Sequence, residues 1–212
     1  MGQYLGPACR QCRREGKKLH LKGVRCETAK CPLERQWRNF PPGMHAFRGR
    51  RRQASPYGVR LREKQKFKRY YGLLERQFMV YFRMAERARI NTGDALLITV
   101  ERRLDNVVHK LGFAPSRRSA RQVIGHGHIH VNGRKVNRPG YLVSVGDRIA
   151  ARPTESSQKY IRAALGEGTP QVQAWLSLDV NRLEAQVVAL PSPEDVQAPA
   201  VQTQLIVEMC SR

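Results

Sequence analysis

Four of the five cysteines lie within the first 31 residues, as two close pairs. Cys9 and Cys12 form one pair, Cys26 and Cys31 form the other, and thirteen residues separate the pairs. Four thiolates at this spacing can complete a tetrahedral zinc site. Two disulfides are the alternative, which a reducing compartment disfavours. Because four cysteines leave no open position for water, we expect one structural zinc rather than a catalytic metal.

A second set of residues suited to binding lies between positions 116 and 134. Ser116 is expected to cap a short helix, and the first turns of that helix carry Arg117, Arg118 and Arg121. Guanidinium groups beside the free N–H groups of a helix N-terminus form a phosphate-binding surface. A solvated helix face without a ligand is the alternative. The turn Asn132-Gly133-Arg134 adds polar and cationic groups, so RNA is the favoured ligand.

Residues typical of catalysis are missing from the sequence. It has no paired carboxylates, no Gly-rich phosphate loop and no nucleophile elbow. His126, His128 and His130 alternate, but the carboxylates usual in hydrolytic metal sites do not accompany them. We therefore expect surface or RNA-facing histidines, no enzyme activity and no small-molecule substrate.

The chain is strongly and unevenly basic. Its 39 lysines and arginines against 17 aspartates and glutamates give a net charge of +22. The net charge is +16 over residues 1–70, +8 over 71–150 and −2 over 151–212. Nucleic acid is the polyanion that would neutralise such a charge, because each phosphate contact releases counterions. An anionic membrane is the alternative, but no apolar run approaches the length of a spanning helix. No signal peptide is recognisable, so a cytoplasmic protein without a membrane partner is expected.

Several helices are predicted after an N-terminal stretch that has too few apolar residues for a core of its own. The patterns predict helices over 57–70 and 74–89, and a longer helix over 94–111. The nearly neutral segment beyond residue 165 contains apolar clusters near both ends, and we expect it to pack on the helical part.

A small antiparallel sheet is predicted after the short helix, which should cover 117–124. Residues 128–131 alternate in polarity and 134–136 return beyond Asn132-Gly133, a dipeptide typical of a type I′ turn. Further short strands are predicted over 141–143 and 148–151. The predicted fold class is therefore α+β.

Several motifs together resemble one family, small-subunit ribosomal protein four of the universal set. The resemblance covers nearly the whole chain. Its motifs are Tyr4-Leu5-Gly6-Pro7, Arg13-Arg14-Glu15-Gly16, the run from Tyr57 to Lys66, Leu104-Asp105-Asn106-Val107-Val108, Ser116-Arg117-Arg118, His130-Val131-Asn132-Gly133-Arg134, Trp175-Leu176-Ser177-Leu178-Asp179 and Leu205-Ile206-Val207-Glu208.

The resemblance implies a domain organisation. A zinc-binding segment would cover 1–45, as in the zinc-bearing bacterial-type branch. A helical RNA-binding domain would cover 46–101 and be completed by 166–212, which would pack on it. A small RNA-binding domain, helix-turn-helix plus antiparallel sheet, would be inserted over 102–165.

The resemblance also implies a function. Such a protein is a structural constituent of the small ribosomal subunit that binds 16S-type ribosomal RNA at a helix junction of the 5′ domain and nucleates assembly. Contacts with ribosomal protein five of the same subunit would bear on decoding accuracy, and Arg48 with Arg50–Arg52 would lie near the messenger RNA entry path. The residues that we expect to contact RNA are Arg13, Arg14, Arg48, Arg50, Arg51, Arg52, Arg60, Arg62, Lys64, Lys66, Arg69, Arg103, Lys110, Ser116, Arg117, Arg118, Arg121, His126, Asn132 and Arg134.

A few residues depart from the family pattern. Pro56 replaces the usual Asp, Met44 and Ala46 alter a loop, and Met209-Cys210 replaces an aromatic pair. Two other classes of function are weighed against the ribosomal one. An RNA-modifying enzyme would need a catalytic domain for which 212 residues leave no room. A zinc-dependent DNA-binding regulator would prefer duplex DNA over ribosomal RNA in a competition experiment.

Overall fold

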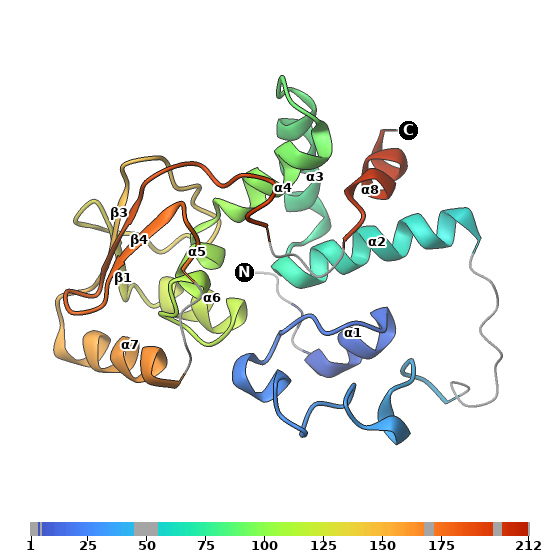
Figure 1. Ribbon diagram of the computed structural model, residues 1–212, viewed down its shortest axis with the longest axis horizontal. Coiled ribbons are helices and arrows are strands. Elements are labelled where there is room, and N and C mark those ends of the chain that lie inside the picture. Colours follow the sequence, from blue (N-terminus) through green and yellow to red (C-terminus); the bar gives the residue numbers. More distant parts are fainter. Residues whose placement is uncertain (1–3, 5, 45–54, 168–171, 197–200, 212) are drawn as a thin grey trace. The chain divides into compact units, whose positions relative to one another are not determined.

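The computed structural model describes residues 4, 6–44, 55–167, 172–196 and 201–211. The chain divides into two compact units. Unit 1 comprises Met1–Leu96 and Ala198–Arg212, and unit 2 comprises Leu97–Gln197. The described part of unit 1 is helical, whereas unit 2 combines helices with an antiparallel sheet (Figure 1).

The described part of unit 1 contains four complete helices and two 3₁₀ turns. They are α1 (Ala8–Glu15), the 3₁₀ turns η1 (Gly23–Cys26) and η2 (Gln36–Arg38), α2 (Pro56–Tyr71), α3 (Glu75–Glu86) and α8 (Thr203–Cys210). Helix α2 begins at a proline after Ser55, whose Oγ accepts a hydrogen bond from the N–H of Gly58 at 3.2 Å. It ends at Gly72, which has φ +65°. The helices predicted over 57–70 and 74–89 are thereby confirmed.

Aromatic rings form the core of unit 1. The ring of Phe67 lies 4.9 Å from that of Tyr71 and 5.9 Å from that of Phe78. Phe78 stacks on Phe82 at 6.1 Å, and α8 packs on α2 and buries Ile206. Edge and offset contacts of this kind add to the stability gained from burying apolar area.

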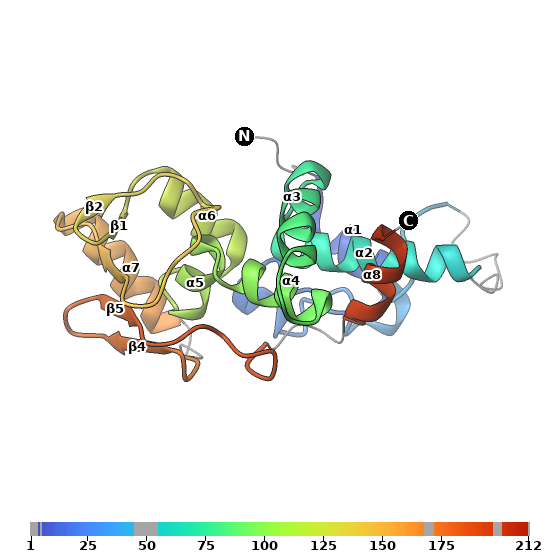
Figure 2. The same cartoon turned by 90° about the horizontal axis from the view of Figure 1, so that it is seen from above.

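Unit 2 contains one five-stranded antiparallel sheet. Its strands are β1 (Ile129–Val131), β2 (Arg134–Lys135), β3 (Arg148–Ala151), β4 (Leu176–Asp179) and β5 (Glu184–Val187), in the order β2-β1-β3-β5-β4. Helices α5 (Leu104–Lys110), α6 (Arg117–Gly125) and α7 (Glu155–Glu167) share a hydrophobic core with the sheet (Figure 2). Alternate strand residues such as Ile149, Ala185 and Val187 face one apolar core together with the helices.

The predicted hairpin is confirmed. His130 pairs with Lys135 and Val131 with Arg134. Asn132 and Gly133 have φ values of +51° and +76°, as a type I′ turn requires. The dipeptide thus sets the register of β1 and β2.

The sequence pattern predicted one helix over 94–111, but the structure has two helices there. Helix α4 (Thr92–Glu101) ends before Arg103, whose ψ of 136° is extended, and α5 begins at Leu104. The N–H groups of Leu104 and Asp105 donate to the carbonyls of Tyr141 and Pro139 at 2.8 and 3.1 Å. The loop that supplies these acceptors therefore interrupts the helix. For the same reason residues 141–143 form no strand, only a bridge between Leu142 and Arg103.

The predicted domain boundaries need one correction. Residues 166–212, expected to pack on the helical part, divide between the units. Strands β4 and β5 extend the sheet of unit 2, since β5 pairs with β3 from Arg148–Gln186 to Ala150–Glu184. Trp175, Leu183 and Val187 are buried in that core, so the apolar residues near 176 serve the sheet and only α8 joins unit 1.

We expect Gly133→Ala to lower the free energy of unfolding by about 1 kcal/mol, because an L side chain is strained at positive φ. No other atom lies near its Cβ position, so backbone strain alone is measured. Gly166→Ala is the matched control, since this glycine lies in α7 and its Cβ position is also open. It should be neutral or stabilising by up to about 1 kcal/mol. Urea unfolding followed by circular dichroism checks both, and an equal loss for the two variants would contradict the argument.

Candidate nucleic-acid interface

Most of the described residues that were predicted to contact RNA are bonded to other side chains of the protein. Arg48 and Arg50–Arg52 lie outside the described residues. Ion pairs hold Arg60, Arg62, Lys64, Lys66, Arg69, Arg103, Lys110 and Arg121. Arg14, Arg118, His126, Asn132 and Arg134 are exposed, Arg13 is half-buried, and Ser116 and Arg117 are buried. The structure therefore separates internal cations from those that a ligand can reach.

In unit 1, carboxylates tie helices together through the predicted arginines. The side chain of Glu15 is only 1% exposed and pairs with Arg69 and, at 3.4 Å, with Arg62. Burial raises the pKa of Glu15, although the two arginines act in the opposite direction. Arg60 donates to Glu208 at 2.9 Å. These arginines therefore join α2 to α1 and to α8.

Two predicted lysines of α2 are also held by carboxylates. The Nζ of Lys64 lies 2.7 Å from Glu75 and 5.3 Å from the Phe78 ring. Lys66 is 4% exposed and pairs with Glu63 at 2.5 Å. Lys64 therefore joins α2 to α3, whereas the pair of Lys66 lies within α2.

In unit 2, Arg103 is fully buried. Its Nε and Nη2 donate to the two carboxylate oxygens of Asp105 at 3.1 and 2.6 Å. The Nε of Arg121 lies 3.2 Å from the same carboxylate. One buried aspartate thus binds arginines from the α4–α5 junction and from α6. No solvent reaches the Arg103 side chain in this structure, so it presents no surface for the RNA contact that was predicted.

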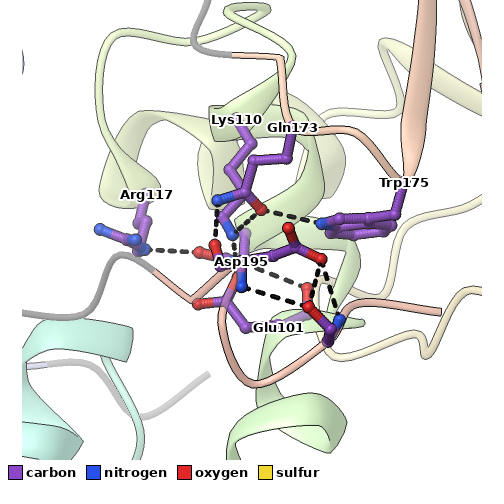
Figure 3. Close-up of polar contacts among 8 residues, drawn as sticks. Glu101, Lys110, Arg117, Gln173, Trp175 and Asp195 are labelled. Atoms are coloured by element: carbon purple, nitrogen blue, oxygen red, sulfur yellow. Dashed lines mark hydrogen bonds and ion pairs between the residues drawn. The ribbon is translucent and has the colours of Figure 1, made fainter.

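Lys110 lies in a buried polar network (Figure 3). Its Nζ pairs with Glu101 and donates to the side-chain oxygen of Gln173. The indole N–H of Trp175 donates to the same oxygen at 2.8 Å, and the Gln173 amide donates to the carbonyl of Asp195 at 2.5 Å. Burial lowers the pKa of Lys110, although Glu101 favours its charged form. The Lys110 side chain is therefore held by bonds inside the protein, and its contact with RNA stays a prediction.

Asn106 extends this network to helix α6. Its amide donates to a carboxylate oxygen of Glu101 at 2.5 Å and to the Glu101 carbonyl at 3.2 Å. Its side-chain oxygen accepts from the Nε of Arg117 at 2.7 Å. Arg117 is 9% exposed, so little of its side chain is open to a phosphate in this structure. The network fixes the first turn of α6 to α4 and α5.

Sequence reasoning missed the carboxylates and amides that organise these two sets of buried contacts. They are Glu101, Asp105, Asn106 and Gln173. A signal was available in Leu104–Val108, where two polar residues stand in an apolar run and all five are buried. Buried polar side chains require partners, so these two positions predict internal bonds to nearby cations.

The N-terminus of α6 has the predicted cap. The Oγ of Ser116 accepts from the N–H of Ser119 at 3.2 Å, and the extended backbone of Ser116 ends the preceding turn. Arg118 is exposed beside it. The Ser119 and Tyr160 hydroxyls are 3.0 Å apart, which links α6 to α7. The fixed network on one side of α6 thus leaves Arg118 open on the other.

The hairpin contains two residues that were predicted to contact RNA, Asn132 and Arg134. The Asn132 amide donates to Asp147 at 2.8 Å, and its oxygen accepts from the N–H of Arg148 at 2.9 Å. Asn132 therefore holds the turn, whereas Arg134 is exposed. His126 is exposed beside His128, whose Nδ1 lies 2.9 Å from the Ser157 hydroxyl. Burial lowers the pKa of His128, and His126 lowers it further.

Residues 117–162, all of them described, present a strongly basic surface. These residues include eight exposed cations but one exposed carboxylate, Glu155. The eight cations, which we call the unit 2 basic surface, are Arg118, Arg134, Lys135, Arg138, Arg148, Arg152, Lys159 and Arg162. A polyanion is the ligand that such a surface attracts.

The four N-terminal cysteines are free thiols in one region of unit 1. Cys12, Cys26 and Cys31 are buried and Cys9 is half-buried. Burial, together with the negative charges of the other three cysteines, raises the pKa of Cys12 to about 11. The N–H of Lys22 donates to the Cys26 sulfur at 3.4 Å. The donor types suit zinc, but no three metal-binding side chains are close enough to form a site within the described residues.

Arg117 and Arg118 are adjacent and chemically identical, so they provide a direct test of the network. Arg117→Met leaves the Asn106 oxygen without this buried donor and should lower the free energy of unfolding by about 1–3 kcal/mol. Arg118→Met removes an exposed charge and should change it by less than about 0.5 kcal/mol. Urea unfolding of the two variants measures the difference. Equal stability would show that Arg117 is not held as described.

Comparison with known proteins agrees with these features. A model of the ribosomal protein S4/S9 N-terminal domain matches residues 3–101, and a model of the S4 domain matches residues 102–149. Over the full length of both chains, the sequence is 52% identical to small ribosomal subunit protein uS4A of Symbiobacterium thermophilum. It is 51% and 50% identical, also over full lengths, to the uS4 proteins of Halothermothrix orenii and Thermus thermophilus. Among the described helices, none is both long and apolar enough to cross a membrane. The chain belongs to the small ribosomal subunit protein uS4 family.

Proposed function

We propose that the chain is a structural constituent of the small ribosomal subunit that binds ribosomal RNA directly. Full-length similarity to uS4 proteins supports this assignment. The family consists of ribosomal proteins and not of enzymes, in agreement with the sequence, which lacks the residues of an acid–base site.

The observation that carries the proposal is the unit 2 basic surface around α6 and the hairpin. Arg118 stands beside a capped helix N-terminus, and Arg134 follows the turn of β1 and β2. Guanidinium groups and helix N–H groups bind phosphate oxygens without reading bases. Recognition would then rest mainly on RNA shape and backbone, as in other proteins that bind folded RNA.

We also propose four finer aspects of the function. They are binding at a helix junction of the 5′ domain, nucleation of subunit assembly, contact with ribosomal protein five and an effect on decoding accuracy. The full-length family membership supports them. A messenger RNA contact would involve Arg48 and Arg50–Arg52, which lie outside the described residues.

We also propose one structural zinc bound by Cys9, Cys12, Cys26 and Cys31. The support is the spacing of the four cysteines as two close pairs, in a segment with few apolar residues for a core. Zinc would contribute folding free energy to this segment, since metal binding and folding are coupled in core-poor domains.

Arg118→Gln and Arg134→Gln should each weaken binding of a 5′-domain ribosomal RNA fragment by about tenfold, because a charge-assisted contact contributes about 1.5–3 kcal/mol. Each should also reduce the slope of log affinity against log salt by about 0.9 for every phosphate that the variant no longer neutralises. Filter binding at several salt concentrations measures both effects.

The control for this experiment is Arg182→Gln, which removes an equal charge from the β4–β5 turn, where the side chain is 79% exposed. It should change affinity by less than about twofold, as expected for a cation without a close phosphate. Duplex DNA of equal length should compete poorly. Equal losses for all three variants, or tighter binding of DNA, would contradict the proposal.

Elemental analysis of the purified protein should give one zinc per chain. Cys12→Ser or Cys26→Ser should reduce the zinc content strongly, because a closed site requires all its ligands. Cys210→Ser is the matched control and should keep the metal, since Cys210 belongs to α8. Zinc-free protein isolated without chelator, or disulfides detected by mass, would refute the site.

A further inference from the structure

The chain has two tryptophans, and their environments are opposite. Trp175 lies in the core of unit 2 and is 2% exposed. Trp37 lies in η2 of unit 1 and is 61% exposed. A tryptophan side chain carries a large apolar surface, so this degree of exposure leaves much of the indole open to a ligand.

Two arginines accompany Trp37. The guanidinium carbon of Arg38 lies 4.4 Å from the centroid of the indole, and that of Arg35 lies 5.8 Å from it. The Nε of Arg35 donates to the Ala29 carbonyl at 3.2 Å, which restricts this side chain. Cations over the ring stabilise its orientation through the ring quadrupole. The indole is thus exposed and has two arginines close to it.

The charge around this indole favours a polyanion. Residues 6–44, all described, contain ten basic and three acidic side chains. Two of the three carboxylates are paired with cations of the protein, the buried Glu15 side chain with arginines of α2 and the exposed Glu34 with Lys18. A membrane surface would also attract such charge, but an interfacial helix needs an apolar face. The neighbours Gln36, Arg38 and Asn39 are polar and exposed, so RNA fits this surface better.

An exposed aromatic ring on a basic surface is suited to a nucleobase. Unpaired RNA bases stack on aromatic rings and on guanidinium planes, and the adjacent cations bind the backbone phosphates. Such stacking differs from the contacts of the unit 2 basic surface, which reach phosphates. Trp37 would therefore recognise an unpaired nucleotide and not a duplex.

We propose that Trp37, with Arg38 beside it, is a stacking platform for an unpaired nucleobase of ribosomal RNA. The proposal rests on the proposed function, because it requires that the chain binds ribosomal RNA. It adds a contact to a base, made by unit 1, to the phosphate contacts of α6 and the hairpin.

Tryptophan fluorescence of the full-length protein tests the proposal. A stacked base should quench the emission of Trp37 saturably during titration with the ribosomal RNA fragment, whereas buried Trp175 serves as an internal reference. Trp37→Phe should abolish the quenching but keep most of the affinity, because a phenyl ring also stacks. Trp37→Ala should weaken binding by about tenfold, as expected for the loss of one stacked base. The midpoint of urea unfolding should not change, since the indole is exposed.

Further measurements distinguish a failure of the Trp37 platform from a failure of the proposed function. A short single-stranded oligoribonucleotide should quench Trp37 more than a duplex of the same length. Wild-type affinity of Trp37→Ala, together with no quenching in the parent protein, would overturn the platform and leave the proposed function intact if Arg118→Gln still weakens binding. No binding of ribosomal RNA by the parent protein would instead refute the proposed function. A shift of Trp37 emission on phosphatidylglycerol vesicles but not on RNA would assign this surface to membranes and overturn the proposal.

Discussion

The ion pair of Lys110 with Glu101 lies in the interior of unit 2, where each charge is stabilised by the other. A buried charge that loses its partner costs several kcal/mol, on the order of 3–5. Asn106 and Gln173 complete the shell of this pair and extend it to Arg117 and Trp175. Helices α5 and α6 and the segment before β4 are therefore held by one set of bonds. The position of the α6 N-terminus, and of Arg118 on it, depends on that set.

The scarcity of carboxylates decides which cations remain available to RNA. With 39 basic and 17 acidic side chains, most cations cannot have an acidic partner. The buried carboxylates Glu15, Glu101 and Asp105 bind arginines and lysines between helices, and eight exposed cations form the unit 2 basic surface over residues 117–162. Internal pairing thus builds the fold, and unpaired excess charge supplies the affinity for a polyanion.

Features fixed by local chemistry were predictable from the sequence. The Ser116 cap, the short helix after it and the Asn132-Gly133 turn depend on few neighbouring residues, and the structure confirms them. The burial of Arg103 and Arg117 was not predictable from charge, because it depends on partners brought together by tertiary packing. The break between α4 and α5 escaped the periodicity for the same reason, since the acceptors are the carbonyls of Pro139 and Tyr141. Pairing of β5 with β3 likewise joins residues distant in sequence.

The central claim is that the arginines divide into internal ones and RNA-binding ones. Modification with phenylglyoxal, read by mass spectrometry with and without the 5′-domain ribosomal RNA fragment, tests it most directly. In the free protein Arg118 and Arg134 should react readily, whereas Arg103 and Arg117 should react slowly because they are buried. RNA should protect Arg118 and Arg134 and leave the slow pair unchanged. Fast reaction of Arg117 that RNA suppresses, with no protection of Arg118, would contradict the account.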